Sequence, residues 1–297
     1  MATAVDPAPT PEISIVVRTV GSAHLADALT SLEAQDHRMF EAVVVDMSGG
    51  ASDDVLASFE RRLPSLRRVA GGRRSRPAAL NAGIRAARAP VIAILDDDNL
   101  YDSGHLARLA DGIREKDLVY TGVRHATLMP EGRLIGSRDV SLPWRFEDVL
   151  LGNYVYTAGT AFRRVLWETL GGYDERFPVF EDWDFVIRAG ISGRVAHLQG
   201  ISASSRKFTG AEGVSGFERE TAEARRCLAG IYWKHRRLIG RARLRDLRAA
   251  WSEHCRRRPG ARTGLLARSV LGWRLELGLD LVSWWGRSLL PADGTAS

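Results

Sequence analysis

The chain has 297 residues, of which 45% are hydrophobic and 26% charged, and it carries a formal net charge of +6. This is the composition of an ordinary globular protein. Two cysteines are too few for a disulfide framework, and no run of 18 uncharged apolar residues predicts a spanning helix. The positive charge alone does not choose between nucleic acid, anionic lipid and phosphorylated substrates. Residues 1–11 are small, acidic and proline-rich, which predicts a disordered arm rather than a signal peptide.

Apolar runs and helical patterns alternate at short spacing up to residue 123. Strands are predicted at 13–17, 43–45, 66–70, 91–95 and 117–123, and helices over 22–32, 53–62, 78–87 and 102–115. Ser22 and Asp102 are the expected N-caps of the first and last of these helices. Strands that alternate with helices in this way predict an α/β fold built on a parallel sheet.

One predicted strand ends in three carboxylates. Residues 91–95 form an apolar, β-branched run typical of a strand buried on both faces, and Asp96, Asp97 and Asp98 follow at its carboxyl end. Adjacent carboxylates repel one another, so the fold needs a counter-charge, for which a divalent cation is the natural candidate. A solvated acidic turn that caps the next helix is the alternative interpretation of these residues alone.

Polar residues also follow two other predicted strands. Thr19 comes after the first strand and Asp46 after the second. Because parallel strands present their carboxyl ends at one edge of a sheet, we expect Thr19, Asp46 and the three aspartates to lie together. This convergence favours a ligand site over an acidic surface turn.

The chain is more irregular between residues 124 and 198. The pattern predicts a hairpin over 124–143, a helix over 146–151, a strand over 153–162, a helix over 164–170 that stops at Gly171-Gly172, and a strand over 195–198. A second acidic group, Glu181, Asp182 and Asp184, opens a short amphipathic helix. The helix dipole accounts well for one acid at this position, but less well for three that are interleaved with aromatic residues.

From about residue 216 the sequence becomes helical and basic. Its charge runs are more often solvated faces than binding sites, and no helix-turn-helix, zinc-knuckle or RNA-binding pattern indicates nucleic acid. A last predicted helix, over 264–290, has a broad apolar side with three tryptophans. It is expected to dock on its own domain or on a second subunit of a homodimer; the alternative is an interfacial helix on an anionic membrane surface.

Five stretches resemble, in order and spacing, the motifs of the family 2 glycosyltransferases, over residues 13–238. These are the first strand at 13–19, the strand and turn at 43–49, the basic segment 76–81, the DXD motif Asp96–Asp98, and the glycine turn 171–174 followed by Glu181-Asp182. A DXD motif alone is a weak signal, whereas five motifs in the right order are a strong one.

The resemblance implies a GT-A fold, which is a mixed, mostly parallel α/β sheet flanked by helices. The expected domains are the arm 1–11, a glycosyltransferase domain 12–238 and a basic, amphipathic helical C-terminal region 239–297. The implied activity is inverting transfer, assisted by Mn²⁺ or Mg²⁺, of a sugar from a UDP-, dTDP- or GDP-sugar to a hydroxyl of a glycan or lipid-linked glycan in cell-surface polysaccharide biosynthesis. The expected location is the cytoplasm, or the cytoplasmic face of the membrane if the C-terminal helix binds lipid.

On the donor side, the resemblance also implies roles for single residues. Asp98 would ligate the metal, and Asp96, the second residue of the predicted metal site, would contact the nucleotide ribose or assist through water. Thr19 and Asp46 would lie against the nucleobase, and Arg76 would face the diphosphate. The residues predicted to bind the donor are therefore Thr19, Asp46, Arg76, Asn81 and Asp96. Within this set, Asn81 is expected chiefly to fix the local helix and loop.

The acceptor hydroxyl is a poor nucleophile, so its attack needs a general base. Inversion by a single displacement puts that base opposite the leaving group, on a different segment from the DXD motif. By its place in the motif Asp182 is the predicted base. Glu181 would orient the base or the acceptor, and Asp184 is the alternative base.

The sequence also departs from the family's pattern. Met47 stands where the family has a second acid, Asp97 has no expected role, and residues 204–208 lack the family's metal-binding histidine, so that Arg206 or Lys207 would hold the diphosphate directly. Three alternative functions follow. They are a catalytically impaired sugar-nucleotide-binding relative, a sugar nucleotidyltransferase, whose glycine-rich signature is missing here, and a basic nucleic-acid-binding protein.

Overall fold

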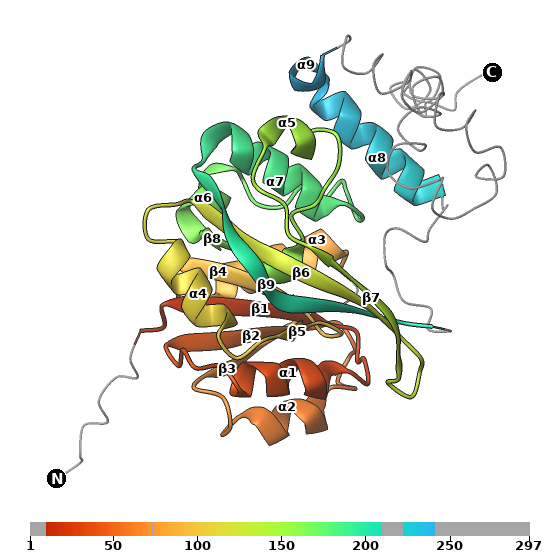
Figure 1. The fold of residues 1–297 in the computed structure, drawn as a ribbon. Helices are drawn as coiled ribbons and strands as arrows, with labels where there is room; N and C mark the ends of the chain where they lie inside the picture. The colour runs from red at the N-terminus through yellow and green to blue at the C-terminus, as the bar shows by residue number, and fades with distance from the viewer. Residues whose placement is uncertain (1–9, 73, 210–221, 241–297) are drawn as a thin grey trace, which may run out of the picture. The chain divides into compact units, whose positions relative to one another are not determined.

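The computed structural model describes residues 10–72, 74–209 and 222–240 (Figure 1). The chain divides into two compact units. The first contains the residues up to Val149 and from Asn153 to Gly213, and the second contains Leu150–Gly152 and the residues from Val214 onward. Every residue of the predicted site belongs to the first unit. The predicted domain boundary near residue 238 stays a prediction, and the predicted helix 264–290 lies outside the described residues.

A mixed sheet, nine-stranded over the described residues, forms the centre of the first unit. Its strands are β1 (Ile13–Thr19), β2 (Phe40–Asp46), β3 (Leu66–Ala70), β4 (Val91–Asp96), β5 (Leu100–Tyr101), β6 (Leu118–Leu128), β7 (Leu134–Val140), β8 (Thr160–Arg163) and β9 (Val195–Phe208). Their order is β3-β2-β1-β4-β8-β6-β9-β5, with β7 paired to β6. Strands β3, β2, β1 and β4 are parallel, β8 is antiparallel to β4 and β6, and β6 is parallel to β9.

Helices cover both faces of the parallel part of the sheet (Figure 1). The helices of this unit are α1 (Leu25–Glu33), α2 (Asp53–Phe59), α3 (Arg76–Ala86), α4 (His105–Gly112), α5 (Phe146–Val149), α6 (Arg164–Thr169) and α7 (Glu181–Ser192). Ile15 and Val17 of β1 share one apolar core with residues of α1, α2 and α4. Val16, between them, points to the other face and meets α3, where a Cβ on Gly83 would lie 2.5 Å from the Val16 Cγ1.

The parallel register brings the carboxyl ends of three strands together. Thr19 pairs with Asp46 across β1 and β2, and Arg18 pairs with Asp96 across β1 and β4. All seven residues of β1 are buried, as expected of a β-branched strand that is covered on both faces. The predicted convergence of Thr19, Asp46 and Asp96 at one sheet edge is confirmed.

The predicted strand over 153–162 is wrong for most of its length. Only β8 is extended; a 3-10 turn, Thr157–Gly159, and irregular chain precede it. The cause is local, because the Asn153 side chain accepts a hydrogen bond from the backbone N–H of Val155 and closes a turn. Asparagine commonly competes with regular structure in this way, and the alternation of apolar residues does not reveal it.

The two predicted N-caps are also wrong. The cap position of α1 is His24, and Ser22 instead accepts a hydrogen bond from the His24 backbone N–H in the turn before the helix. The cap position of α4 is Gly104, and Asp102 contributes its backbone carbonyl, which accepts from the His105 N–H. Ser22 and Asp102 each lie two residues before the cap position. They accept a hydrogen bond in the turn that leads into the helix, and neither caps it with its side chain.

The remaining elements predicted between residues 13 and 198 are present, most of them with shifted ends. The hairpin over 124–143 is β6 paired antiparallel with β7, and the helix predicted at 164–170 is α6, followed by Gly171 at a φ of +73°. The strand predicted at 195–198 continues to Phe208. This extension matters for the site, because the end of β9 lies beside β5 and the turn that carries the DXD aspartates.

The described part of the second unit contains α8 (Ala222–Lys234) and α9 (Arg236–Ile239). The hydroxyl of Tyr232 donates to the backbone carbonyl of Leu151 within this unit. Among the residues that the structure describes, none of the helices has the length and apolar character that crossing a bilayer requires.

Candidate active site

Asp96, the last residue of β4, is held between two arginines. Its Oδ1 accepts a hydrogen bond of 2.6 Å from Nε of Arg18, and its Oδ2 lies 3.7 Å from Nη2 of Arg76. Burial alone raises the pKa of Asp96, but the two guanidinium charges outweigh it and leave the pKa below its ordinary value. Asp96 is therefore a firmly ionised carboxylate whose oxygens already have cationic partners.

Asp97 and Asp98 form the turn after β4 and differ sharply from Asp96. Asp97 accepts hydrogen bonds from the Thr19 hydroxyl and the Val20 N–H, the latter at 3.3 Å, so it holds the loop that follows β1. Burial raises the pKa of Asp98 to about 7, and the neighbouring charges of Asp96 and Asp97 add to this rise. Asp97 thus has a positioning role that the sequence did not predict, and Asp98 is a carboxylate short of counter-charge.

Arg206 supports the aspartate turn from the end of β9. Its Nε donates to the Asp98 backbone carbonyl at 2.7 Å, and its Nη1 donates to Asp27 of α1 at 2.9 Å. Two of its donors are therefore committed to the protein, whereas its Nη2 is buried without a hydrogen-bond partner among the described residues. Contact of Arg206 with the diphosphate stays a prediction.

Arg18 and Arg76, the two arginines that hold Asp96, also contact Glu181, the first residue of α7. Nη1 of Arg18 donates to Glu181 Oε1 at 2.9 Å, and Nε of Arg76 lies 3.5 Å from the same oxygen. The Arg18 side chain is only 8% exposed, whereas that of Arg76 is 31% exposed. The four side chains come from β1, α3, β4 and α7, and together they join the DXD strand to the second acidic group.

Asp182 follows Glu181 in the first turn of α7. Its Oδ1 accepts a hydrogen bond from the Trp183 N–H at 2.8 Å, and its Oδ2 accepts from Asn153 Nδ2 at 3.0 Å and Thr157 Oγ1 at 3.2 Å. Burial raises the pKa of Asp182 to about 6, and the charge of Glu181 adds to the effect. Three donors thus orient a carboxylate whose pKa lies close to neutral pH, which suits a general base.

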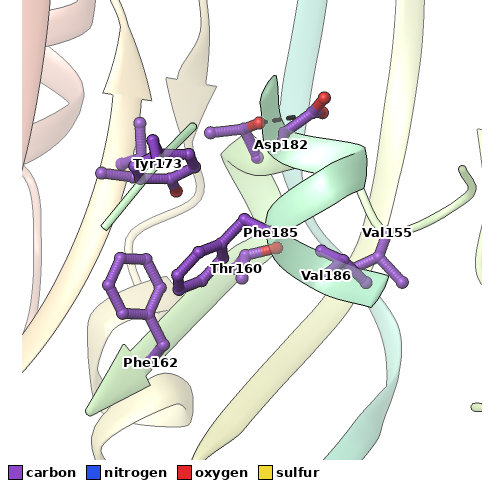
Figure 2. A pocket seen from close by; sticks show the side chains of 9 residues that line it. Val155, Thr160, Phe162, Tyr173, Asp182, Phe185 and Val186 are labelled. Carbon is purple, nitrogen blue, oxygen red and sulfur yellow. Dashed lines mark hydrogen bonds between the residues drawn. The ribbon is translucent and has the colours of Figure 1, made fainter. Parts of the chain in front are cut away.

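Asp182 lines a small pocket whose other walls are mainly apolar (Figure 2). The labelled lining residues are Val155, Thr160, Phe162, Tyr173, Asp182, Phe185 and Val186. The Phe185 ring packs against the two other rings of the pocket, with centroids 4.8 Å from Phe162 and 4.7 Å from Tyr173. This apolar wall accounts physically for the burial that raises the pKa of Asp182.

Phe180 turns the chain into α7. Its φ of 63° is left-handed, and it is the one non-glycine residue with a positive φ in the described parts of the chain. Such a conformation costs about 1–3 kcal/mol and tends to occur at functional sites. Here it immediately precedes Glu181 and Asp182, so the strained residue sets the direction in which both acids leave the loop.

Thr19 and Asp46 lie at the predicted sheet edge, and each is tied into a turn. Asp46 Oδ1 accepts hydrogen bonds from the backbone N–H and the hydroxyl of Ser48, and Thr19 Oγ1 accepts one of 3.0 Å from the Gly21 N–H. Their place in the fold is confirmed. Contact of either residue with a nucleobase stays a prediction.

Asn81 of α3 uses its amide entirely within the protein. Its Nδ2 donates to the Tyr173 carbonyl and to Glu175, and its Oδ1 accepts from Trp167 Nε1 and the Tyr173 N–H. It therefore holds the glycine turn that precedes α7 against α3. This arrangement agrees with the expectation that Asn81 fixes the local structure, and it disfavours a direct contact with the donor.

Residues 14–167 match the family described as "Glycosyl transferase family 2". A relative from Mycobacterium bovis (strain BCG / Pasteur 1173P2), the PGL/p-HBAD biosynthesis glycosyltransferase, is 32% identical over 214 residues, which cover 67% of this chain and 78% of the relative. The chain belongs to glycosyltransferase family 2. The uncharacterized glycosyltransferase YwdF of Bacillus subtilis (strain 168) is 27% identical over 199 residues, covering 63% of this chain and 71% of the relative.

Solved glycosyltransferases share the fold. Residues 1–349 of S. aureus TarS, in complex with UDP-GlcNAc, superpose with a TM-score of 0.56 at 14% identity, covering 96% of this chain and 95% of that one. The mannosyltransferase PcManGT from Pyrobaculum calidifontis, in complex with GDP-Man and Mn²⁺, gives 0.55 at 18% identity, covering 98% and 78%. The chain spans 43% of a longer TarS chain. At such identities the likeness concerns the fold alone, and it confirms the predicted GT-A architecture.

Three residues at the site of this glycosyltransferase were not predicted from the sequence. Arg18 is the one with a signal, because a charge at the end of a strand that is buried on both faces requires a buried partner. Asn153 and Thr157 had no such signal, since they lie in the segment that was predicted to be a strand. All three act on acids that the sequence did predict.

One carboxylate at the site, that of Asp98, has the oxygen chemistry that a hard divalent cation requires. Burial together with the charges of Asp96 and Asp97 raises the pKa of Asp98 to about 7. The described residues contain no group of three or more His, Cys, Asp or Glu side chains that could hold a metal by themselves, and Asp96 is paired with Arg18 and Arg76. A cation here would thus rely on Asp98 and on oxygens from a ligand.

Proposed function

We propose that this family 2 glycosyltransferase inverts the anomeric centre while it transfers a sugar from a nucleoside-diphosphate donor to a hydroxyl acceptor. The observation that carries the proposal is the ion-pair cluster of Arg18, Arg76, Asp96 and Glu181. Through Glu181, this cluster joins the helix that carries the predicted base, Asp182, to the strand that ends in the aspartate turn. A direct displacement needs a donor group and a base in such proximity.

On the donor side, Thr19 and Asp46 would contact the nucleobase at the end of β1 and β2, and Arg76 would contact the diphosphate. Arg76 is the more exposed of the two arginines, and a guanidinium matches phosphate geometry. The donors named for the neighbours, UDP-GlcNAc with TarS and GDP-Man with Mn²⁺ with the mannosyltransferase, support a sugar nucleotide as donor.

Asp98 would hold a divalent cation, Mn²⁺ or Mg²⁺, together with oxygens of the donor diphosphate. When bound, such a cation neutralises the charge that grows on the leaving diphosphate. The chain's own contribution is a single carboxylate with a raised pKa, placed by the turn after β4 and by Arg206. Asp96, held by its two arginines, would position the turn rather than ligate the metal.

On the acceptor side, Asp182 would accept the proton of the attacking hydroxyl. Its carboxylate is oriented by Asn153, Thr157 and its own helix, and it borders a pocket. Relatives named for PGL/p-HBAD biosynthesis and for succinoglycan biosynthesis support a glycan or lipid-linked glycan as acceptor. The cytoplasmic or membrane-surface location, and the homodimer, stay predictions.

The first experiment is a thermal-shift panel of UDP, GDP, dTDP and their common sugar conjugates, with and without Mn²⁺. A ligand that binds only the folded state raises its melting temperature, so one nucleotide class should do so more strongly when Mn²⁺ is present. The sugar nucleotide that binds is then supplied with candidate acceptors, and the anomeric configuration of the product is read by NMR. Absence of any shift, or retention of configuration, would overturn the proposal, and binding without turnover would favour a catalytically impaired relative.

A further inference from the structure

We propose that Arg18 is a positioning residue of the transfer reaction: it holds the helix that carries Asp182 against the strand that carries the donor-side aspartates. The inference rests on the proposed function, since it takes Asp182 as the base and the turn after β4 as the donor side. It adds a residue to the reaction that none of the predicted motif roles includes.

One guanidinium joins two distant parts of the chain. Its Nε donates to Asp96 of β4, 78 positions away in sequence, and its Nη1 donates to Glu181 of α7, 163 positions away. A planar guanidinium can make two directed bonds at once, so the distance between the two carboxylates is set by the shape of one side chain. Because Asp182 follows Glu181 directly, this link also sets the distance from the base to the aspartate turn.

The burial of Arg18 separates its role from that of Arg76. Both arginines contact Asp96 and Glu181, but the side chain of Arg18 is 8% exposed and that of Arg76 is 31% exposed. The distances differ as well: 2.6 and 2.9 Å for Arg18 against 3.7 and 3.5 Å for Arg76. Arg18 is enclosed and tightly bonded, so it acts through the two acids, whereas Arg76 faces the open side where a diphosphate would bind.

Arg188 provides a matched control, because it lies on α7, the helix that carries Asp182. Its Nε donates to the buried Asp184 at 2.8 Å, and its Nη1 and Nη2 donate to the carbonyls of Leu170 and Gly172. Like Arg18, Arg188 is a largely buried arginine that anchors α7, and 14% of its side chain is exposed. Its contacts do not include the donor-side aspartates, so its loss should cost stability without moving the base relative to the donor.

The kinetic test compares Arg18→Met, Arg18→Lys, Arg76→Met and Arg188→Met, each well below its melting temperature. The substrate is whichever of UDP-GlcNAc, UDP-glucose and GDP-mannose, with Mn²⁺, the unmodified enzyme turns over or hydrolyses. Arg18→Met should lower kcat by about 100-fold, the cost of misplacing a reacting group by about 1 Å, with little change in the donor KM or in UDP and GDP affinity by calorimetry.

Arg76→Met should raise the donor KM and weaken nucleotide binding. Arg188→Met should lower the melting temperature but keep kcat, and Arg18→Lys should restore only part of the lost kcat.

A second readout needs no turnover. Amide hydrogen exchange should speed up in the first turn of α7 in Arg18→Met, including the Asp184 amide that donates to the Phe180 carbonyl. In Arg188→Met the faster exchange should extend from Asp184 along the helix and into the turn at 170–172, which Arg188 also holds. If Arg18→Met does not fold, Glu181→Leu removes the acceptor at the other end of the same link and should show the same loss of kcat and the same local exchange.

The outcomes separate this inference from the proposed function. If Asp182→Asn abolishes turnover while Arg18→Met keeps it, the positioning role falls and the proposed function stands. If Arg18→Met loses nucleotide affinity as Arg76→Met does, Arg18 is a donor contact and the positioning role is again overturned. If the unmodified enzyme binds none of UDP, GDP and dTDP, the proposed function falls. Unchanged exchange in the first turn of α7 in Arg18→Met would overturn the link itself.

Discussion

The donor side and the acceptor side of the candidate site are built in different ways. Thr19, Asp46 and Asp96 end three neighbouring parallel strands, so the backbone register places them. Asp182 is instead placed by side chains, because its Oδ2 bonds to Asn153 and Thr157 from an irregular loop. Main-chain pairing is shared among many residues, whereas a side-chain bond is lost with one substitution. The donor side should therefore tolerate changes in neighbouring side chains better than the acceptor side.

The largest expected effect comes from Asp182→Asn. Loss of a general base should lower kcat by about 10²–10⁴-fold and leave nucleoside-diphosphate affinity in place. The pKa of Asp182 is raised to about 6 in the folded state, above its ordinary 3.8. The protonated acid therefore stabilises the fold below about pH 4, and this contribution is lost as the pH rises through 6. The melting temperature of the variant relative to the unmodified protein should then increase from pH 4 to pH 7, and near-normal kcat would exclude Asp182 as the base.

Asp98→Asn tests the donor-side carboxylate whose pKa is raised to about 7. Turnover should fall by about 100-fold, since cation assistance is worth several kcal/mol, and Mn²⁺ should no longer strengthen UDP or GDP binding. Without metal, the variant should melt at a higher temperature than the unmodified protein at pH 8, because it removes one charge from three crowded carboxylates. Retained Mn²⁺ dependence in calorimetry would assign the metal to other ligands.

Asn153→Ala tests whether side chains tune the base. In the unmodified enzyme kcat should fall as the pH drops below about 6, because the base must be deprotonated. Removing a donor that favours the charged carboxylate should raise the pKa of Asp182, move this limb to higher pH and lower kcat by about 10-fold. The control is Thr160→Val, which lines the same pocket but donates to the Tyr156 carbonyl, and its pH profile should stay unchanged. An unmoved limb in Asn153→Ala would show that the loop does not tune Asp182.

Asn81→Ala should have the smallest effect on activity. It leaves the Trp167 indole N–H and the Tyr173 N–H without their acceptor, which should destabilise the fold by about 1–3 kcal/mol in chemical unfolding. Well below the melting temperature, UDP and GDP affinity should match the unmodified protein, because the amide is committed to the protein. A selective loss of nucleotide affinity would restore the donor-binding role that the motif assigned to Asn81.

The same contrast explains which parts of the site could be predicted from the sequence. The strands at 13–17, 43–45 and 91–95 are apolar and β-branched, and their polar endings predicted the sheet edge correctly. The segment 153–162 also alternates, but a hydrogen bond from the Val155 N–H to the Asn153 side chain turns it away from a strand. No role for Asp97 was expected from the sequence, whereas in the structure it accepts hydrogen bonds from Thr19 and Val20.

By itself, the sequence determined the α/β alternation, the meeting of Thr19, Asp46 and Asp96 at one edge, and the family. Local periodicity and strand direction suffice for the first two, because parallel strands share one carboxyl edge, whereas the family follows from the resemblance of five motifs in order. Only the tertiary structure decided that Asp96 is neutralised by Arg18 and Arg76 while Asp98 is not, and that Arg18 also bonds to Glu181. The reason is that charge pairing and desolvation depend on distances in space between residues far apart along the chain, and no local pattern encodes those distances.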